Sequence, residues 1–162
     1  MTLQKKDFIE INFTGKTQEG NIFDSNIEED LKKANIELKN SPKPFTFALG
    51  EGMFLKSVDE FLIGKPETPA KYSLELTPEK AFGIREPKLV QVVPMKVFFE
   101  QKINPIPGAS LNFDGRMGKI LSVSSGRVTV DFNHPLAGKT VIYDINVLRK
   151  VEDMNEKISA FN

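Results

Sequence analysis

The side chains best suited to chemistry in this chain are aromatic and apolar rather than ionisable. Its 162 residues include 13 Phe and 2 Tyr but no Cys, no Trp and one His. Without Cys there is no thiol nucleophile, disulfide or sulfur-ligated metal, and one His excludes a multi-His metal site. We therefore expect no metal and no cofactor. The 22 basic and 22 acidic side chains cancel, which argues against a general nucleic-acid-binding protein.

The conventional catalytic signals are weak. The segment 50–52, Gly-Glu-Gly, lies between a strand-like and a helix-like segment, as a phosphate loop does, but it lacks the Lys-Ser/Thr ending. His134 lies in the polar turn 133–138, where a lone His is more often structural than catalytic. Asp24 and Asp131 have no acid–base partner in the sequence, and turn capping is their simplest role.

Aromatic residues recur at the ends of predicted strands, in turns and at the start of a predicted helix. For any single ring, ordinary core packing is the simplest explanation. Together, however, rings at the ends of elements can line an apolar pocket. The set consists of Phe13, Phe23, Phe45, Phe54, Phe82 and Tyr143.

Four segments alternate apolar and polar residues with the period of a half-buried strand. They cover residues 9–13, 45–49, 70–76 and 141–147 and are compatible with one antiparallel sheet. No apolar run approaches the roughly 18 residues that a membrane span requires, and no apolar stretch of a secretory signal is present at the start. We expect a cytoplasmic protein.

Two segments predict helices. Apolar residues at i, i+4, i+7 and i+8 from Phe54 form one helical face, and Gly64 provides a stop. Residues 27–36 predict a surface helix with a thin apolar stripe, in which Ser25 and Glu28 have the spacing of a capping box.

The segment 88–131 differs in character from the rest of the chain. It contains a β-rich run at 89–93, a helical turn that begins at Pro94, and a hairpin signal around 124–126. Its six basic and three acidic side chains give it a charge of +3 and leave −3 for the remainder. We therefore expect an α+β fold, mostly β, in which a small β-rich domain interrupts an antiparallel sheet wrapped on a short helix. The predicted domains are 1–87 plus 132–151, the insertion 88–131, and a tail 152–162.

Several blocks, in the right order between about residues 7 and 151, resemble FKBP-type peptidyl-prolyl cis-trans isomerases. The insertion falls where SlyD-like members carry an insert-in-flap domain, and the helix over 27–36 is most similar to archaeal long-type members. Since those members continue into a further domain, the chain is either a naturally short member or part of a longer protein. The blocks are Phe13-Thr14-Gly15, 20–25, 45–55, 76–83 and 131–139.

The resemblance implies catalysis of rotation about X–Pro bonds, whose barrier is roughly 18–20 kcal/mol because rotation breaks amide resonance. Rotation forms no covalent bond and needs no proton transfer to a side chain. A water-poor aromatic pocket lowers the cost of the less polar twisted amide. The lack of conventional catalytic motifs agrees with such a site.

By position, the resemblance assigns roles to named residues. Asp24 projects a carboxylate toward the twisting amide, Leu55 offers its backbone N–H to the substrate carbonyl, and Phe82 and Tyr143 complete the catalytic set. The residues that the resemblance implies for substrate binding are Phe13, Phe23, Phe45, Phe54, Val58, Leu136, Ala137 and, peripherally, His134.

Three positions depart from the family pattern. Phe13 and Phe82 stand where many members have Tyr, and Val58 stands where a Trp often forms the pocket floor. We expect retained isomerase activity and weak macrolide binding. The missing hydroxyls leave open an alternative, a non-catalytic module that binds proline-containing segments. An inactive scaffold would require a disrupted Asp24 or aromatic cluster, and neither is disrupted.

The insertion carries many apolar residues for its size. Exposed apolar patches usually mark protein-binding surfaces, so we expect the insertion to bind unfolded or nascent polypeptides and to present their X–Pro bonds to the pocket. The alternative is that these residues form only the core of the insertion. We expect a monomer that binds neither nucleic acid nor membranes. The predicted client-binding residues are Val90, Val92, Val93, Met95, Val97, Phe98 and Phe99.

Overall fold

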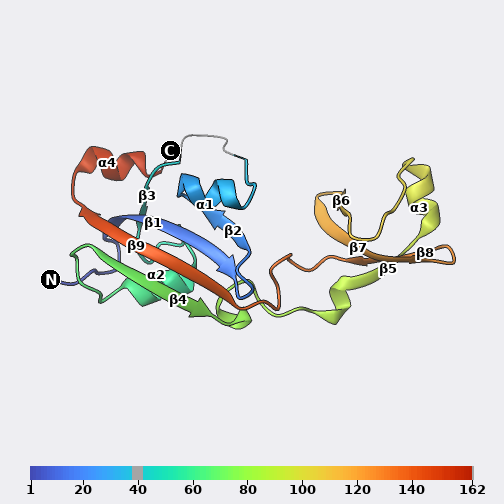
Figure 1. The fold of residues 1–162 in the computed structure, drawn as a ribbon, viewed down its shortest axis with the longest axis horizontal. Helices are drawn as coiled ribbons and strands as arrows, with labels where there is room; N and C mark the ends of the chain where they lie inside the picture. The colour runs from blue at the N-terminus through green and yellow to red at the C-terminus, as the bar shows by residue number, and fades with distance from the viewer. Residues whose placement is uncertain (38–41, 162) are drawn as a thin grey trace. The chain divides into compact units, whose positions relative to one another are not determined.

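The structure, a computed structural model, describes residues 1–37 and 42–161 (Figure 1). Its contacts divide the chain into two compact units. We call Met1–Phe82 with Lys139–Asn162 the host unit, and Gly83–Gly138 the insert unit. None of the helices in the described part of the chain is long and apolar enough to cross a membrane.

The host unit is built on an antiparallel sheet that confirms the four predicted strands and adds one more. The strand order is β2-β1-β9-β4, and β3 also pairs with β1. Figure 1 shows the two long strands, β1 and β9, side by side. The bounds are β1 Phe8–Thr17, β2 Ile22–Ser25, β3 Phe45–Ala48, β4 Ala70–Leu76 and β9 Val141–Val151.

The two faces of the host sheet have different partners because successive strand residues point to opposite sides. Ile11 and Phe13 of β1 face the core, where they share a buried cluster with Val58 and Leu62 of α2 (Lys56–Leu62). On the other face, Thr14 donates a hydrogen bond to Asp30 of α1 at 2.5 Å. Helix α2 begins two residues after Phe54, so the predicted helix there is confirmed in a shorter form.

Helix α1 (Glu28–Lys33) lies within the predicted segment 27–36, but the predicted capping box is wrong. The N-cap residue is Ile27, which makes no side-chain cap hydrogen bond. The Ser25 hydroxyl instead accepts the N–H of Ile27 at 2.9 Å and donates to the carbonyl of Phe13 at 3.0 Å. The Ser25 hydroxyl therefore bonds to a backbone group of β1 instead of capping α1.

A third helix of the host unit, α4 (Met154–Ser159), follows β9 in the segment predicted as a tail. The carboxylate of Asp153 caps it by accepting the N–H groups of Asn155 and Glu156. Two of the four N–H groups that have no partner within the first turn of a helix are thereby satisfied.

The insert unit has its own sheet and its own core. The predicted β-rich run, helical turn and hairpin are confirmed as β5, α3 and the β7–β8 pair. The turn residues Ser125 and Gly126 have φ values of 44° and 78°, as a two-residue hairpin turn requires. The strand order is β5-β8-β7-β6, with bounds β5 Val90–Pro94, α3 Met95–Glu100, β6 Ser110–Phe113, β7 Arg116–Ser124 and β8 Arg127–Asp131.

The two segments at the base of the insert unit are tied together. Asn133 accepts the N–H of Glu86 at 2.9 Å and donates to its carbonyl at 3.2 Å. Arg85 forms an ion pair with Asp131 at 2.7 Å. Although burial raises the pKa of the Asp131 carboxyl, hydrogen bonds from Asn133 and the Arg85 guanidinium outweigh it and lower that pKa. The segment that enters the insert unit and the segment that leaves it are thus joined by hydrogen bonds and an ion pair.

Candidate functional site: an aromatic pocket on the host sheet

A hollow of about 410 Å³ opens on the core-facing side of the host sheet. This volume is within the range of small-ligand sites. Four of the sequence-predicted residues line it, namely Phe13, Asp24, Phe45 and Phe54. The structure therefore brings together side chains from β1, β2, β3 and the loop before α2.

The walls of the hollow are aromatic rings in edge-to-face and tilted contact. The Phe54 ring centroid lies 5.1 Å from that of Phe13, 5.8 Å from Phe45 and 5.8 Å from Tyr143. Such arrangements are favourable because the positive edge of one ring meets the negative face of another. The pocket wall is thus held in place by the aromatic residues themselves.

A glycine allows two further predicted rings to approach the site. Gly15 on β1 faces Phe23 and Tyr143, whose rings lie 5.7 Å apart. A Cβ at Gly15 would lie 2.7 Å from Phe23 and 2.9 Å from Tyr143, closer than packing permits. Phe82 packs edge-on against Phe23 at 5.6 Å. A side chain at Gly15 would therefore separate Phe23 and Phe82 from the rest of the aromatic set.

Two ionisable groups of the site, Asp24 and Tyr143, interact electrostatically. Partial desolvation raises the pKa of the Asp24 carboxyl, and the N–H of Ser25, which donates to it at 2.9 Å, opposes that rise. Burial, followed by the negative charge of Asp24, raises the pKa of Tyr143 to about 12. The phenol therefore stays protonated at neutral pH and is available as a hydrogen-bond donor.

The loop Gly50–Leu55 supplies one side of the site, and we call it the pocket loop. It carries Met53 and Phe54 into the lining. Leu55 is the N-cap of α2, and its carbonyl accepts the N–H groups of Val58 and Asp59. The backbone N–H of Leu55 remains the predicted donor to substrate.

Sequence reasoning missed the lining residues Asn26, Lys43, Pro44 and Met53. The Asn26 amide joins distant segments, since it accepts the N–H of Phe13 at 2.8 Å and donates to the carbonyl of Lys43 at 3.2 Å. A polar residue that bridges segments has no periodicity to reveal it. Pro44 and Met53 each precede a predicted aromatic residue, which was the available signal.

Other predicted residues lie elsewhere. Val58 is fully buried in the host core and is absent from the lining of the hollow, so it acts here as support beneath the rings. Leu136, Ala137 and His134 belong to the insert unit, where His134 Nδ1 accepts the N–H of Leu136 at 3.0 Å. Their contact with substrate stays a prediction.

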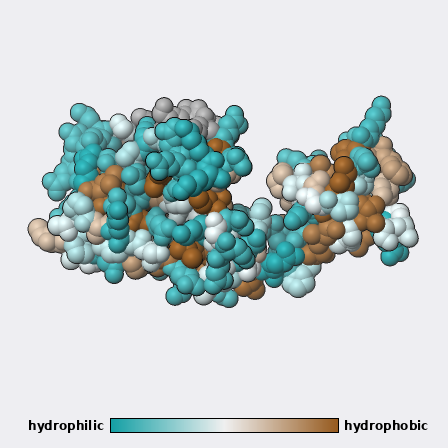
Figure 2. Space-filling view, in the orientation of Figure 1, coloured by the Kyte–Doolittle hydropathy of each residue, from teal (hydrophilic) through white to brown (hydrophobic). Residues whose placement is uncertain are grey.

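The predicted client-binding residues divide into exposed and buried groups. Val92 and Phe99 are 60% and 69% exposed, and Figure 2 shows apolar residues at the surface of this unit. The prediction that Phe98 contacts clients is corrected, because its side chain is 1% exposed and packs into the insert core with Val128 and Val130. In a helix, adjacent residues point in different directions, so Phe98 and Phe99 cannot share one face.

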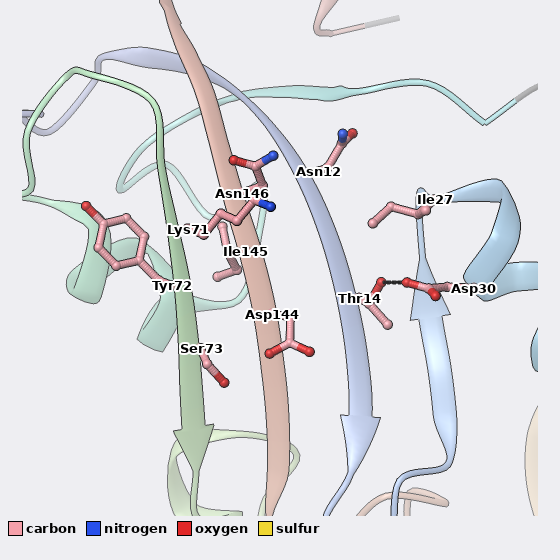
Figure 3. Close-up of a pocket in the computed structure, with 10 residues that line it drawn as sticks. All are labelled: Asn12, Thr14, Ile27, Asp30, Lys71, Tyr72, Ser73, Asp144, Ile145 and Asn146. Atoms are coloured by element: carbon pink, nitrogen blue, oxygen red, sulfur yellow. Dashed lines mark hydrogen bonds between the residues drawn. The ribbon is translucent and has the colours of Figure 1, made fainter.

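A second hollow, of about 480 Å³, lies on the opposite face of the host sheet, between α1 and strands β1, β9 and β4 (Figure 3). Most of the residues that line it are polar, and a hydrogen bond joins two of them, Thr14 and Asp30. It contains none of the predicted site residues. Within residues 1–37 and 42–161, no three His or acidic side chains are grouped so as to hold a metal ion.

Known proteins that are similar to this chain are named peptidyl-prolyl cis-trans isomerases. A family model described as "FKBP26, IF domain" matches residues 91–136. The chain is 30% identical over 146 residues to the short-type peptidyl-prolyl cis-trans isomerase of Methanocaldococcus jannaschii, covering 90% of this chain and 92% of that protein. It is 32% identical to the FKBP-type 16 kDa peptidyl-prolyl cis-trans isomerase of Escherichia coli, covering 91% and 93%.

A third relative is the FKBP-type peptidyl-prolyl cis-trans isomerase SlyD of Helicobacter pylori, 28% identical with 81% of this chain and 70% of that protein covered. The resemblance drawn from the sequence blocks is thereby confirmed, with matches in both archaeal and bacterial proteins. The chain belongs to the FKBP-type peptidyl-prolyl cis-trans isomerase family, and it carries an insert-in-flap domain of the kind found in SlyD-like members.

Proposed function

We propose that this protein accelerates cis–trans rotation about X–Pro bonds in polypeptides, at the aromatic pocket of the host unit. The observation that carries the proposal is the hollow that Phe13, Phe45 and Phe54 line together with Asp24. This lining suits a reaction that needs desolvation and orientation rather than a nucleophile.

The proposed mechanism assigns separate tasks to the rings and the polar groups. The rings hold the prolyl ring in a water-poor site, which favours the twisted amide because that amide has lost its conjugation and part of its dipole. The N–H of Leu55 binds a substrate carbonyl and fixes the chain on one side of the rotating bond. The Asp24 carboxylate faces the nitrogen of the rotating X–Pro amide. The Tyr143 hydroxyl is a further hydrogen-bond donor to the substrate.

An isomerase assay on a short X–Pro peptide, by protease coupling or NMR exchange, tests the proposal. We expect rate enhancement by the wild-type protein and a clear loss with Asp24→Ala. Saturable peptide binding without rate enhancement would instead support the alternative, a binding module for proline-containing segments. Inactivity together with an absence of binding would exclude both.

The Phe82 position offers a second measurement. A hydroxyl introduced by Phe82→Tyr should strengthen binding of peptides and macrolides by about 0.5–1.5 kcal/mol, the usual net value of one hydrogen bond. The matched change Phe61→Tyr lies on the far end of α2, beside Tyr72, and should leave both affinities unchanged. Equal affinities for wild type and Phe82→Tyr would contradict the proposed role of this position.

We further propose that the insert unit binds unfolded polypeptides through its exposed apolar side chains. Val92, Val97 and Phe99 are exposed, and Ile106 and Met117 of the same unit are exposed as well. Large exposed apolar groups typically mark protein-binding surfaces, and Met adapts to varied partners.

Paired surface variants separate this role from isomerase activity. The double variant Val92→Thr, Phe99→Gln should lose suppression of client aggregation and slow the refolding of a proline-limited protein, while short-peptide activity persists. The control Met154→Gln removes an exposed apolar side chain of the host unit instead. Unchanged refolding catalysis by the double variant would refute the chaperone role.

A further inference from the structure

A buried carboxylate lies beneath the pocket loop and has no part in the mechanism above. Asp59 of α2 is 3% exposed, and its Oδ2 atom accepts the backbone N–H of Gly50 at 3.1 Å. Its Oδ1 atom is fully buried and has no hydrogen-bond partner among the residues that the structure describes. Burying a carboxylate oxygen without a partner opposes folding, so the position calls for a reason other than stability.

Asp59 is bonded to both ends of the pocket loop. Its side chain holds the N–H of Gly50, where the loop begins. Its backbone N–H donates to the carbonyl of Leu55 at 3.1 Å, where the loop ends and α2 starts. A single residue therefore fixes the separation of the two loop ends, and Met53 and Phe54 lie between them.

The anchored end of the loop has an unusual backbone geometry. Gly50 has a φ of 77°, in the left-handed region that favours glycine. A Cβ there would lie 2.8 Å from the Lys5 side chain, which covers this point of the loop. The Asp59 carboxylate supplies the acceptor that holds Gly50 in this conformation, and the direction in which the loop leaves Gly50 sets where Phe54 lies.

The hydrogen bond does not depend on the charge of Asp59. Burial raises the pKa of the Asp59 carboxyl, the N–H of Gly50 lowers it, and the adjacent Glu60 raises it. An oxygen of the protonated or the ionised carboxyl can accept the Gly50 N–H equally in geometric terms. An amide oxygen at the same place should therefore serve the same purpose.

We propose that Asp59 is a positioning residue for isomerisation, which holds the pocket loop so that Phe54 and the Leu55 N–H meet the substrate, at a cost in fold stability. The inference rests on the proposed isomerase activity for its kinetic consequence, and on the geometry alone for its effect on the loop. It predicts that an apolar replacement lowers activity without lowering stability.

Three variants of the full chain test the proposal. Asp59→Leu has a similar branched shape but no acceptor, Asp59→Asn keeps an oxygen for Gly50, and Glu60→Gln is a matched control on the exposed neighbour. For Asp59→Leu we expect kcat/KM to fall about tenfold, the equivalent of one hydrogen bond to a carboxylate, while the melting temperature is unchanged or higher. Asp59→Asn should restore most of the activity, and Glu60→Gln should match wild type.

Amide NMR spectra of the same variants provide a readout that does not depend on turnover. The Gly50 and Leu55 resonances should shift strongly in Asp59→Leu and weakly in Asp59→Asn. Normal activity and unshifted loop resonances in Asp59→Leu would overturn the proposal, as would a loss in Asp59→Asn equal to that in Asp59→Leu. Activity lost only in proportion to unfolding would show a structural role and also overturn it. An inactive wild type would refute the isomerase proposal, and the loop shifts would still decide this one.

Discussion

Replacement of Asn26 by Ala tests how the pocket is attached to the host sheet. The Asn26 amide accepts the N–H of Phe13 at 2.8 Å and donates to the carbonyls of Ile11 at 3.0 Å and Lys43 at 3.2 Å. Asn26 directly follows β2, and its side chain thus hydrogen-bonds to three backbone groups. Asn26→Ala removes all three bonds together.

The magnitude follows from the surroundings of each bond. A neutral hydrogen bond contributes about 0.5–1.5 kcal/mol net, and a buried donor left without a partner costs about 1–3 kcal/mol. Phe13 is buried, so its N–H carries the larger penalty, whereas the bond to exposed Lys43 contributes little. We expect a total loss of about 2–3 kcal/mol in the free energy of unfolding, which corresponds to a melting temperature lower by about 5–10 °C.

Denaturant unfolding and the peptide isomerase assay measure the two consequences. Stability should fall as estimated, and kcat/KM should fall as well because Lys43 precedes Phe45 of the pocket wall. Asn12→Ala is the matched control, since Asn12 lies half-buried on the opposite face of β1 and makes no side-chain hydrogen bond among the described residues. The free energy of unfolding of the Asn12→Ala variant should differ from that of wild type by no more than about 0.5 kcal/mol. Equal stabilities for the two variants would refute the reasoning.

Three further predictions concern the insert unit. Phe98→Ala should destabilise it by about 3–5 kcal/mol because the ring is buried, whereas Phe99→Ala should change stability by less than about 0.5 kcal/mol in the same unfolding experiment. Gly118→Ala should cost about 1–3 kcal/mol by calorimetry, since its Cβ would lie 2.6 Å from Val130 Cγ1. Because the Asp131 pKa is lowered by folding, its stabilisation is present above the ordinary Asp value of about 4 and is lost as the pH falls below it. Asp131→Asn should flatten that acid limb, and an unaltered pH profile would contradict the assignment.

The host sheet was predictable because its strands follow one repeating rule. Alternation in 9–13 and 141–147 reports directly that one face is buried, and β1 and β9 carry that pattern across the whole sheet. Strand β2 was not predicted as a strand, since Ile22–Ser25 is too short to show a period. The Ser25–Glu28 spacing led to a wrong prediction of a capping box. The cap depends on the direction of the Ser25 hydroxyl, and pairing of β2 with β1 turns that hydroxyl toward the Phe13 carbonyl.

The site was predictable in its rings and unpredictable in its polar supports. Phe13, Phe45 and Phe54 could be identified from their places at the ends of elements and from the resemblance. The Asn26 and Asp59 side chains act through hydrogen bonds to backbone groups 15 and 9 residues away, and no periodic pattern specifies such partners. The sequence also could not separate Phe98 from Phe99, because both are Phe and only the orientation of α3 decides which is buried.

The hydrogen bond between Gly138 N–H and Gly83 C=O, 2.8 Å long at the base of the insert unit, bears on the order of folding. Strands β4 and β9 are direct neighbours although the segment 77–140 separates them in the chain. Closing so long a loop from a disordered state is slow and entropically costly. An insert unit that folds first brings its own ends together and reduces the connection to a short turn, which lowers the closure entropy by about 2 kcal/mol. The same closure would allow the insertion to be exchanged for another domain. Pairing of β4 with β9 requires only that the two ends of the insertion lie close together, whatever the number of residues between them.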